Sequence, residues 1–266
     1  MPIIIKSEDE IAVMREAGHV VAEVLEMLSA EARPGVKTSD LDTIVRQEFK
    51  RRNVVPTFLG YHGYPAHVCV SINEEIVHAI PGSRVLQEGD IVSIDLGATH
   101  RGFVADSALS IGIGEMDARD QRLIEVTHEA LWKGIEAARP GAHVTDIGHA
   151  VQTHAEAEGF SVVREYVGHG VGREMHEDPQ IPNYGSPNRG ALLRKGMVIA
   201  IEPMVNIGDW HTKRHDDGWT VSTLDNSRSA HFEHTIAITD GEPEVLTLRR
   251  TEVRPFAARA AAISNG

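Results

Sequence analysis

Two aspartates interrupt two neighbouring apolar segments, and this feature constrains the fold more than any other. Residues 93 to 109 read Ser-Ile-Asp-Leu-Gly-Ala-Thr-His-Arg-Gly-Phe-Val-Ala-Asp-Ser-Ala-Leu, which places Asp95 in the first apolar run and Asp106 in the second. Two such runs joined by a short polar turn predict a β-hairpin. With the turn centred between His100 and Arg101, we expect the two aspartates directly opposite each other, with β-carbons roughly 5 Å apart.

Opposed carboxylates in an apolar setting destabilise a fold unless one takes a proton or a cation lies between them. The alternative is a pair of solvated aspartates at strand edges. Two more acids favour the cation: Glu202 follows the apolar run 197–201, and Glu233 lies in the strand-like segment 231–238. Four carboxylates carry a charge that two divalent ions would balance. The sequence therefore predicts a two-metal centre formed by Asp95, Asp106, Glu202 and Glu233.

A nitrogen ligand is available in Tyr-Val-Gly-His-Gly-Val-Gly, residues 166–172, where glycines on both sides of His169 allow close backbone approach. The glycine spacing lacks the lysine of a phosphate loop and the full dinucleotide-binding pattern. Among the 15 histidines, His78 and His176 are further candidates for the site. Ordinary surface or packing positions are expected for His19, His62, His128, His143, His154, His211 and His215.

The composition narrows the classes of protein and of metal site. The chain has 266 residues, 41% of them hydrophobic, and a net charge of -13, which argues against a broad nucleic-acid or anionic membrane surface. One cysteine, Cys69, excludes an internal disulfide and a sulfur-rich zinc site. The apolar run at the N-terminus is too short for a secretory core or a membrane span. These features predict a cytoplasmic protein whose metal ligands are nitrogen and oxygen.

The helices predicted from periodicity reveal an internal repeat. A capping box at Ser7 begins one amphipathic helix, and a second is expected from Thr38. The motif of residues 32–41, Ala-Arg-Pro-Gly followed by Ser-Asp-Leu, recurs at residues 138–147 as Ala-Arg-Pro-Gly followed by Thr-Asp-Ile. We expect two pseudo-symmetric halves packed as one domain over residues 1–250, with a C-terminal tail at 251–266.

The five candidate ligands stand in motifs that resemble those of the methionine aminopeptidases. These are Ile-Asp-Leu-Gly around Asp95, Val-Ala-Asp-Ser-Ala around Asp106, Gly-His-Gly-Val-Gly around His169, Ile-Glu-Pro-Met around Glu202 and Phe-Glu-His-Thr around Glu233. The similarity extends from the first helix to about Leu248, and the lack of a long insert looks like the compact bacterial type I form. The resemblance implies an α+β pita-bread fold, an antiparallel sheet covered by helices in two pseudo-symmetric halves.

The resemblance also implies the chemistry: hydrolytic removal of the N-terminal methionine from nascent chains with a small second residue. Asp106 and Glu233 would bridge two divalent ions, Co, Mn, Fe or Zn, and Glu202 would also carry a proton. His78 and His176 would contact the substrate's peptide group. The implied methionine pocket comprises Tyr61, Tyr64, Cys69, Met175 and Trp219. Met175 departs from the phenylalanine that is common there in bacterial enzymes.

Three rival functions remain open at this point. An X-proline aminopeptidase or dipeptidase would share the metal centre, but such enzymes usually carry an extra N-terminal domain, and none fits before residue 7. A binding protein that has lost catalysis would typically lose ligands, and all five are present. A nucleic-acid binder conflicts with the acidic balance. We expect a monomer whose partners are nascent N-termini, with the ribosome as a candidate partner.

Overall fold

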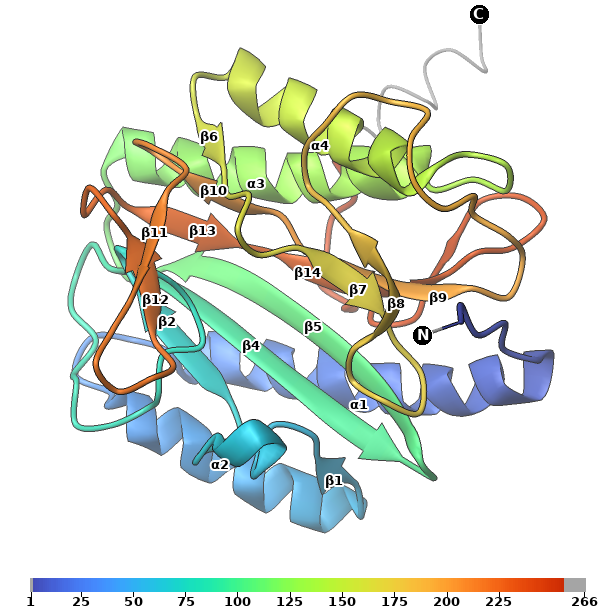
Figure 1. The fold of residues 1–266 in the computed structure, drawn as a ribbon. Helices are drawn as coiled ribbons and strands as arrows, with labels where there is room; N and C mark the ends of the chain where they lie inside the picture. The colour runs from blue at the N-terminus through green and yellow to red at the C-terminus, as the bar shows by residue number, and fades with distance from the viewer. Residues whose placement is uncertain (1, 256–266) are drawn as a thin grey trace, which may run out of the picture.

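The computed structural model describes residues 2–255, and Figure 1 shows a large antiparallel sheet flanked by two pairs of helices. Helix α1 (Glu8–Glu31) packs on strands β4 (Ile91–His100) and β5 (Phe103–Gly112), and α2 (Thr38–Arg52) lies against α1. Helices α3 (Ala118–Ala137) and α4 (Val144–Ala157) lie against each other and mainly beside strands of the second half. No helix within residues 2–255 is long and apolar enough to cross a membrane. The predicted mixture of helices and antiparallel sheet is confirmed.

The elements follow one another in the order helix pair, strands, helix pair, strands. The helices are α1 Glu8–Glu31, α2 Thr38–Arg52, α3 Ala118–Ala137 and α4 Val144–Ala157, with a short 3-10 turn at Tyr61–Gly63. The strands of the first half are β1 Val55–Pro56, β2 Cys69–Ile72, β3 Glu75–Val77, β4 Ile91–His100 and β5 Phe103–Gly112. Those of the second half are β6 Ser161–Val162, β7 Gly168–Gly170, β8 Glu177–Ile181, β9 Val198–Ile201, β10 Met204–Asn206, β11 Thr212–Arg214, β12 Val221–Thr223, β13 Ser229–His231, β14 Glu233–Ala237 and β15 Glu244–Val245.

Three sheets are formed by these strands. The largest sheet of the described residues has nine strands, seven of them in the order β1-β4-β5-β14-β9-β7-β8, with β2 added beside β4 and β15 beside β14. Two three-stranded sheets, β13-β10-β6 and β11-β12-β3, flank it. The order brings β5 of the first half against β14 of the second, so the two halves share one continuous sheet.

The predicted start of the first helix is confirmed by its cap. The Ser7 hydroxyl accepts from the Glu10 amide at 3.3 Å, and the Glu10 carboxylate accepts from the Ser7 amide at 3.0 Å. This reciprocal pairing satisfies two amides at the helix end and stabilises it by about 1 kcal/mol. The buried face of α1, which includes Met14, Val21 and Leu25, then packs on β4 and β5.

The internal repeat predicted from the sequence is visible in the backbone hydrogen bonds. After α1 the Gly35 amide donates to the Leu86 carbonyl at 2.9 Å, and after α3 the Gly141 amide donates to the Leu193 carbonyl at the same distance. In both halves the loop after the first helix of the pair is therefore hydrogen-bonded to the loop that precedes a strand of the large sheet, β4 in the first half and β9 in the second.

The repeat also relates two of the candidate ligands. The amides of Gly89 and Gly196 donate at 2.7 and 2.9 Å to isoleucines that follow neighbouring strands. Asp95 follows Gly89 by six residues, and Glu202 follows Gly196 by the same number. These two acids occupy equivalent places in the two halves, which the sequence motif alone does not reveal.

The hairpin of β4 and β5 forms as predicted, but its turn lies one residue further along. His100 pairs with Phe103, so the turn residues are Arg101 and Gly102, with φ values of 49° and 80°. Positive φ at both positions is the mark of a type I′ turn, whose twist matches that of a two-stranded ribbon. Gly102 adopts such a φ without steric cost, which explains why the turn settles there.

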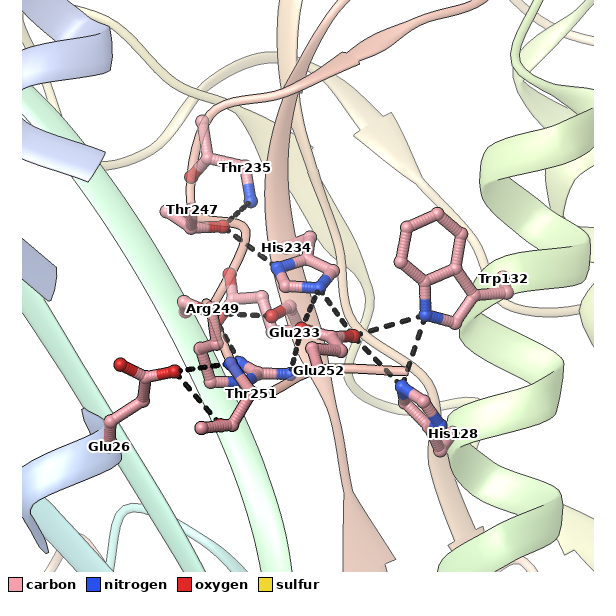
Figure 2. Close-up of polar contacts among 11 residues, drawn as sticks. Glu26, His128, Trp132, Glu233, His234, Thr235, Thr247, Arg249, Thr251 and Glu252 are labelled. Atoms are coloured by element: carbon pink, nitrogen blue, oxygen red, sulfur yellow. Dashed lines mark hydrogen bonds and ion pairs between the residues drawn. The ribbon is translucent and has the colours of Figure 1, made fainter. Parts of the chain in front are cut away.

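A buried polar network lies behind β14, and Figure 2 shows it. The Glu252 carboxylate, with a side chain 3% exposed, is within 3.0 Å of His234 Nε2, 2.8 Å of His128 Nε2 and 2.8 Å of an Arg249 guanidinium nitrogen. The indole N–H of Trp132 donates to the same carboxylate. The predicted tail, residues 251–266, thus includes a buried side chain at its second residue, Glu252, whereas residues 256–266 lie outside the described residues.

Candidate metal centre

Strand pairing aligns three of the predicted site residues in one row across the large sheet. Asp95 pairs with Cys69 on one side and with Ala108 on the other, and Ala108 pairs in turn with Glu233. Laterally paired residues point to the same face of a sheet. Because His234 pairs with Ile201, continuing this register sets Glu202, the next residue after β9, beside Glu233.

Asp106 joins the same face but lies diagonally from Asp95. The predicted direct opposition of the two aspartates is wrong, because the displaced turn pairs Asp106 with Gly97. The partner changes by two residues, and side chains alternate with a period of two, so both carboxylates still point to one face. Gly97 and Ala108, opposite the acids, leave space for them: a β-carbon at Gly97 would lie 3.4 Å from Asp106 Oδ1.

His169 reaches this face from β7. Its neighbour Gly170 pairs with Ile199, which places His169 beside the strand that ends at Glu202. The ring Nδ1 donates to the Gly170 carbonyl at 2.9 Å, so Nε2 carries the lone pair. That nitrogen is 3.5 Å from Glu202 Oε1. Two electron-pair donors that face each other in this way require a proton or a cation between them.

Hydroxyl groups fix the backbone that carries the acids. Thr235 accepts from the Asp106 amide at 3.0 Å and donates to the Asp106 carbonyl at 2.7 Å. Across the same strand pair the Ser107 hydroxyl donates to the Glu233 carbonyl at 2.6 Å. Side-chain bonds therefore reinforce the β5 and β14 pairing at the point where it bears two carboxylates.

The electrostatics of the four acids are those of a site built for cations. Burial, followed by the charges of its neighbouring carboxylates, raises the pKa of Asp95, Glu202 and Glu233 well above the ordinary range. Burial likewise raises the pKa of Asp106 to about 7. Among residues 2–255 no lysine or arginine nitrogen lies within 4.0 Å of these carboxylates, and Asp95 Oδ1, Asp106 Oδ1 and Glu233 Oε1 have no hydrogen-bond partner.

This donor set fits divalent metal ions. Ligand atoms of Asp106, His169 and Glu233 all lie within 4.8 Å of one another, close enough to share an ion. Carboxylate oxygens with one imidazole suit the borderline-hard divalent ions of the first transition row. The hydrogen bond from His169 to a backbone carbonyl is the usual way in which proteins orient such a ligand.

The two histidines predicted to touch substrate lie at the same site. The ring of His176 is centred 4.3 Å from that of His169, and its Nδ1 is 2.6 Å from the Tyr61 hydroxyl. His78 has a φ of 62°, a conformation that is costly for a residue with a β-carbon and clusters at functional sites. Burial, followed by the charge of His176, lowers the pKa of His78 to about 4, so its ring is neutral at pH 7.

A buried ion pair supports the loop that carries His176. Lys6 binds the Glu177 carboxylate, and their side chains are 3% and 4% exposed. The same carboxylate accepts from the Arg173 amide at 2.9 Å. The segment before α1 thus fixes the start of β8, one residue beyond His176.

A cavity of about 390 Å³ adjoins Asp95. All five residues predicted for the methionine pocket line it: Tyr61, Tyr64, Cys69, Met175 and Trp219. Strand pairing explains why the cavity adjoins the acids, because Cys69 pairs with Asp95 and points to the same face of the sheet. Phe58, His62 and Arg214 also line the cavity although they were not assigned to it, His62 having been expected at an ordinary packing or surface position.

Comparison with known proteins shows the family to which the chain belongs. The sequence model of metallopeptidase family M24 matches residues 12–240. Methionine aminopeptidase 1 of Bacillus subtilis is 52% identical over 245 residues, which cover 92% of this chain and 99% of that protein. The five candidate ligands lie within the residues that the family model matches.

Solved structures agree. A methionine aminopeptidase from Thermotoga maritima superposes with a TM-score of 0.91 at 50% identity, covering 92% of this chain and 99% of that one. A prolidase from Pyrococcus horikoshii shares the fold alone, with a TM-score of 0.74 at 24% identity, and the match covers 65% of its chain. By sequence and by structure, this chain belongs to metallopeptidase family M24 and, within it, to the methionine aminopeptidases.

Proposed function

We propose that this chain is a dinuclear hydrolase that removes the N-terminal methionine from nascent proteins whose second residue is small. One observation carries the proposal: Asp95, Asp106 and Glu233 each have a buried carboxylate oxygen without a partner among the described residues, and Asp95 lines a cavity that sulfur and aromatic groups also line. Specificity for methionine is supported both by the cavity and by the high sequence identity to methionine aminopeptidases. The resemblance to prolidase extends to the fold only.

Five residues would hold the metals. Asp106 and Glu233, on the neighbouring strands β5 and β14, would hold metal together with His169, since ligand atoms of these three residues lie within 4.8 Å of one another. Asp95 would serve one ion, and His169 with Glu202 the other. Four carboxylates and two divalent ions balance in charge, which explains why a site without lysine or arginine favours two ions. When bound, such ions lower the pKa of a water molecule and polarise a carbonyl oxygen.

The remaining steps fall to side chains of the chain itself. Glu202, which lies beside His169 and is 14% exposed, would accept a proton from the attacking water and return it to the leaving amine. His78 and His176 would donate to the substrate's peptide group and to the tetrahedral intermediate. The Tyr61 hydroxyl next to His176 would fix the orientation of its ring.

The cavity accounts for the preference for methionine. Cys69 and Met175 offer polarizable sulfur, and Tyr64 and Trp219 form an aromatic pair with centroids 5.1 Å apart. A thioether packs well against both kinds of group. A cavity of about 390 Å³ bounded by His62 and His78 would leave little space for a large second residue.

Peptide cleavage tests this function directly. We expect Met-Gly-Met-Met to be cleaved, an X-Pro-X peptide not to be, and Met-Lys or Met-Phe peptides to be poor substrates. Thorough chelation should abolish cleavage, and adding back Co²⁺ or Mn²⁺ should restore it at two bound ions per chain. Cleavage of X-Pro-X alone, or activity that survives chelation, would refute the proposal.

The substrate also suggests partners and location. New N-termini are formed where translation takes place, so we propose a cytoplasmic enzyme that meets nascent chains near the ribosome. We further propose that it acts as a monomer. Residues 1–250 would form the single catalytic domain.

A further inference from the structure

His231 lies at the metal centre without a role in the function proposed above. It ends β13, where it pairs with Met204. Its amide donates to the Ser110 hydroxyl at 2.8 Å, and that hydroxyl donates to the His231 carbonyl at 2.9 Å. Ser110 is itself 2.7 Å from the Ser93 hydroxyl. Both backbone groups of His231 are therefore fixed by the strands that carry Asp95 and Asp106.

The alternation of side chains directs His231 toward the acids. His231 and Glu233 are two residues apart in an extended segment, so their side chains point to the same side. Phe232 between them packs on the other side, against the ring of His128 at 5.1 Å. The His231 side chain is only 2% exposed.

The ring of His231 has no hydrogen-bond partner at either nitrogen within the described residues. Among the carboxylates of the described residues, Glu202 is the one within 4.0 Å of this ring, with its Oε2 3.7 Å from His231 Nε2. The other oxygen of that carboxylate, Oε1, lies 3.5 Å from His169 Nε2. Glu202 thus stands between two imidazoles, with one oxygen toward each.

The two rings differ in what they can offer the carboxylate. His169 uses its N–H on the Gly170 carbonyl and presents a lone pair. His231 has an N–H to donate, and leaving it unpaired in a buried site costs about 1 to 3 kcal/mol. A shift of less than about 1 Å would bring Nε2 and Oε2 to hydrogen-bond distance.

We infer that His231 is a positioning residue for Glu202. Its Nε2–H donates to Oε2, which turns Oε1 toward His169 and so makes the two oxygens of Glu202 unequal. Oε1 would act as the metal ligand, and Oε2 would be the oxygen that accepts and returns the proton. This inference rests on the proposed function for its consequence in catalysis, but the hydrogen bond itself can be tested without turnover.

Three substitutions test whether His231 acts as a hydrogen-bond donor or only fills space. His231→Gln keeps an N–H donor at a similar reach, His231→Leu keeps volume without a donor, and His231→Asn keeps polarity but is too short to reach Oε2. The exposed His19→Gln serves as the matched control. Each protein is loaded with Co²⁺, and its visible absorption spectrum is recorded together with kcat and KM for Met-Gly-Met-Met.

We expect the Leu and Asn variants to lose about 10- to 100-fold in kcat, with KM changed less than about threefold, and to show altered cobalt bands. The Gln variant should retain kcat within about fivefold and the wild-type spectrum. The inference would be overturned if the Gln and Leu variants had the same kcat and the same cobalt spectrum. It would also be overturned if the Leu and Asn variants matched the wild type in both. If the wild type binds cobalt but does not remove methionine, the proposed function is refuted. The cobalt spectra of the variants still test whether His231 positions Glu202.

Discussion

Glu233 and His234 are neighbours in β14, and their side chains enter two buried clusters of opposite character. On one face Glu233 joins Asp95, Asp106 and Glu202; burial raises the pKa of all four acids, and all of them except Glu202 have a buried oxygen without a partner among the described residues. On the other face His234 meets Glu252 (Figure 2). Burial opposes ionisation of Glu252, but His234, His128 and Arg249 together lower its pKa below the usual range.

The comparison shows that residue type does not distinguish a structural cluster from a reactive one. Both clusters are buried and both combine glutamate with histidine. In the Glu252 network every charge meets an opposite charge or a donor, so the fold itself satisfies the group. In the metal centre the fold offers the four acids no opposite charge, so protons or divalent ions from solution must supply the balance.

The largest effect should come from removing one charge of the metal centre. We expect Asp106→Asn to lower kcat/KM for a methionine peptide on the order of 1,000-fold or more, because the substitution removes a charge from a proposed metal ligand. Asp240→Asn, at a side chain 79% exposed, is the control and should change kcat/KM less than about twofold. Steady-state kinetics with saturating metal measure both. Retention of a tenth of the activity would show that Asp106 is not a required ligand.

A smaller effect, on stability instead of activity, should follow removal of charge from the other cluster. Glu252→Gln leaves buried Arg249 without its partner and should lower the free energy of unfolding by about 3 kcal/mol. The exposed Glu242→Gln should change it by less than about 0.5 kcal/mol. Urea denaturation of the metal-free proteins provides the values. Equal stability of the two variants would remove the contrast between the clusters.

The two clusters should also respond to pH with opposite sign in the metal-free protein. Burial raises the pKa of Asp106 to about 7, above its unfolded value, so its stabilising contribution is present at low pH and is lost as pH rises from about 4 to about 7. The slope for one such carboxyl is about 1.4 kcal/mol per pH unit. Glu252, with a lowered pKa, loses its contribution as pH falls below about 4.5.

Denaturation midpoints of wild type and Asp106→Asn between pH 4 and pH 8 check this prediction. The substitution should flatten the decline between pH 4 and pH 7, and added divalent metal should reverse it. A wild-type protein whose metal-free stability rises steadily from pH 5 to pH 7 would contradict the assignment.

Much of the fold and the site follows from the sequence because the signals are local. The capping box at Ser7, the repeated turn motif and acids in apolar strands each depend on a few adjacent residues. The turn of the hairpin was displaced by one residue because backbone twist, which selects Arg101 and Gly102, competes with the apolar pattern. The prediction that both aspartates point to one face of the sheet is still correct, because the partner of Asp106 changes by two residues, from Asp95 to Gly97.

What the sequence did not provide depends on loops and on long-range packing. Phe58 and His62 reach the cavity from the irregular segment around the 3-10 turn at Tyr61–Gly63, and Arg214 reaches it from the end of the short strand β11. His231 had a usable signal, its spacing of two from Glu233, but only the structure shows Glu202 beside its ring. The burial of Glu252 requires β14 and α3 to be in place, and no local pattern encodes that.

The contact between α1 and the segment after β15 has a consequence for the order of folding. The Thr251 amide and the Glu26 carboxylate form a 2.7 Å hydrogen bond across 225 positions of sequence. Contacts of such separation form late, since closing a long loop costs entropy before it is rewarded. The ligands, too, are divided between the halves, so a half-folded chain offers two aspartates and little else to a divalent ion. Metal should therefore bind only after both halves have folded, and its binding free energy should stabilise only the fully folded protein.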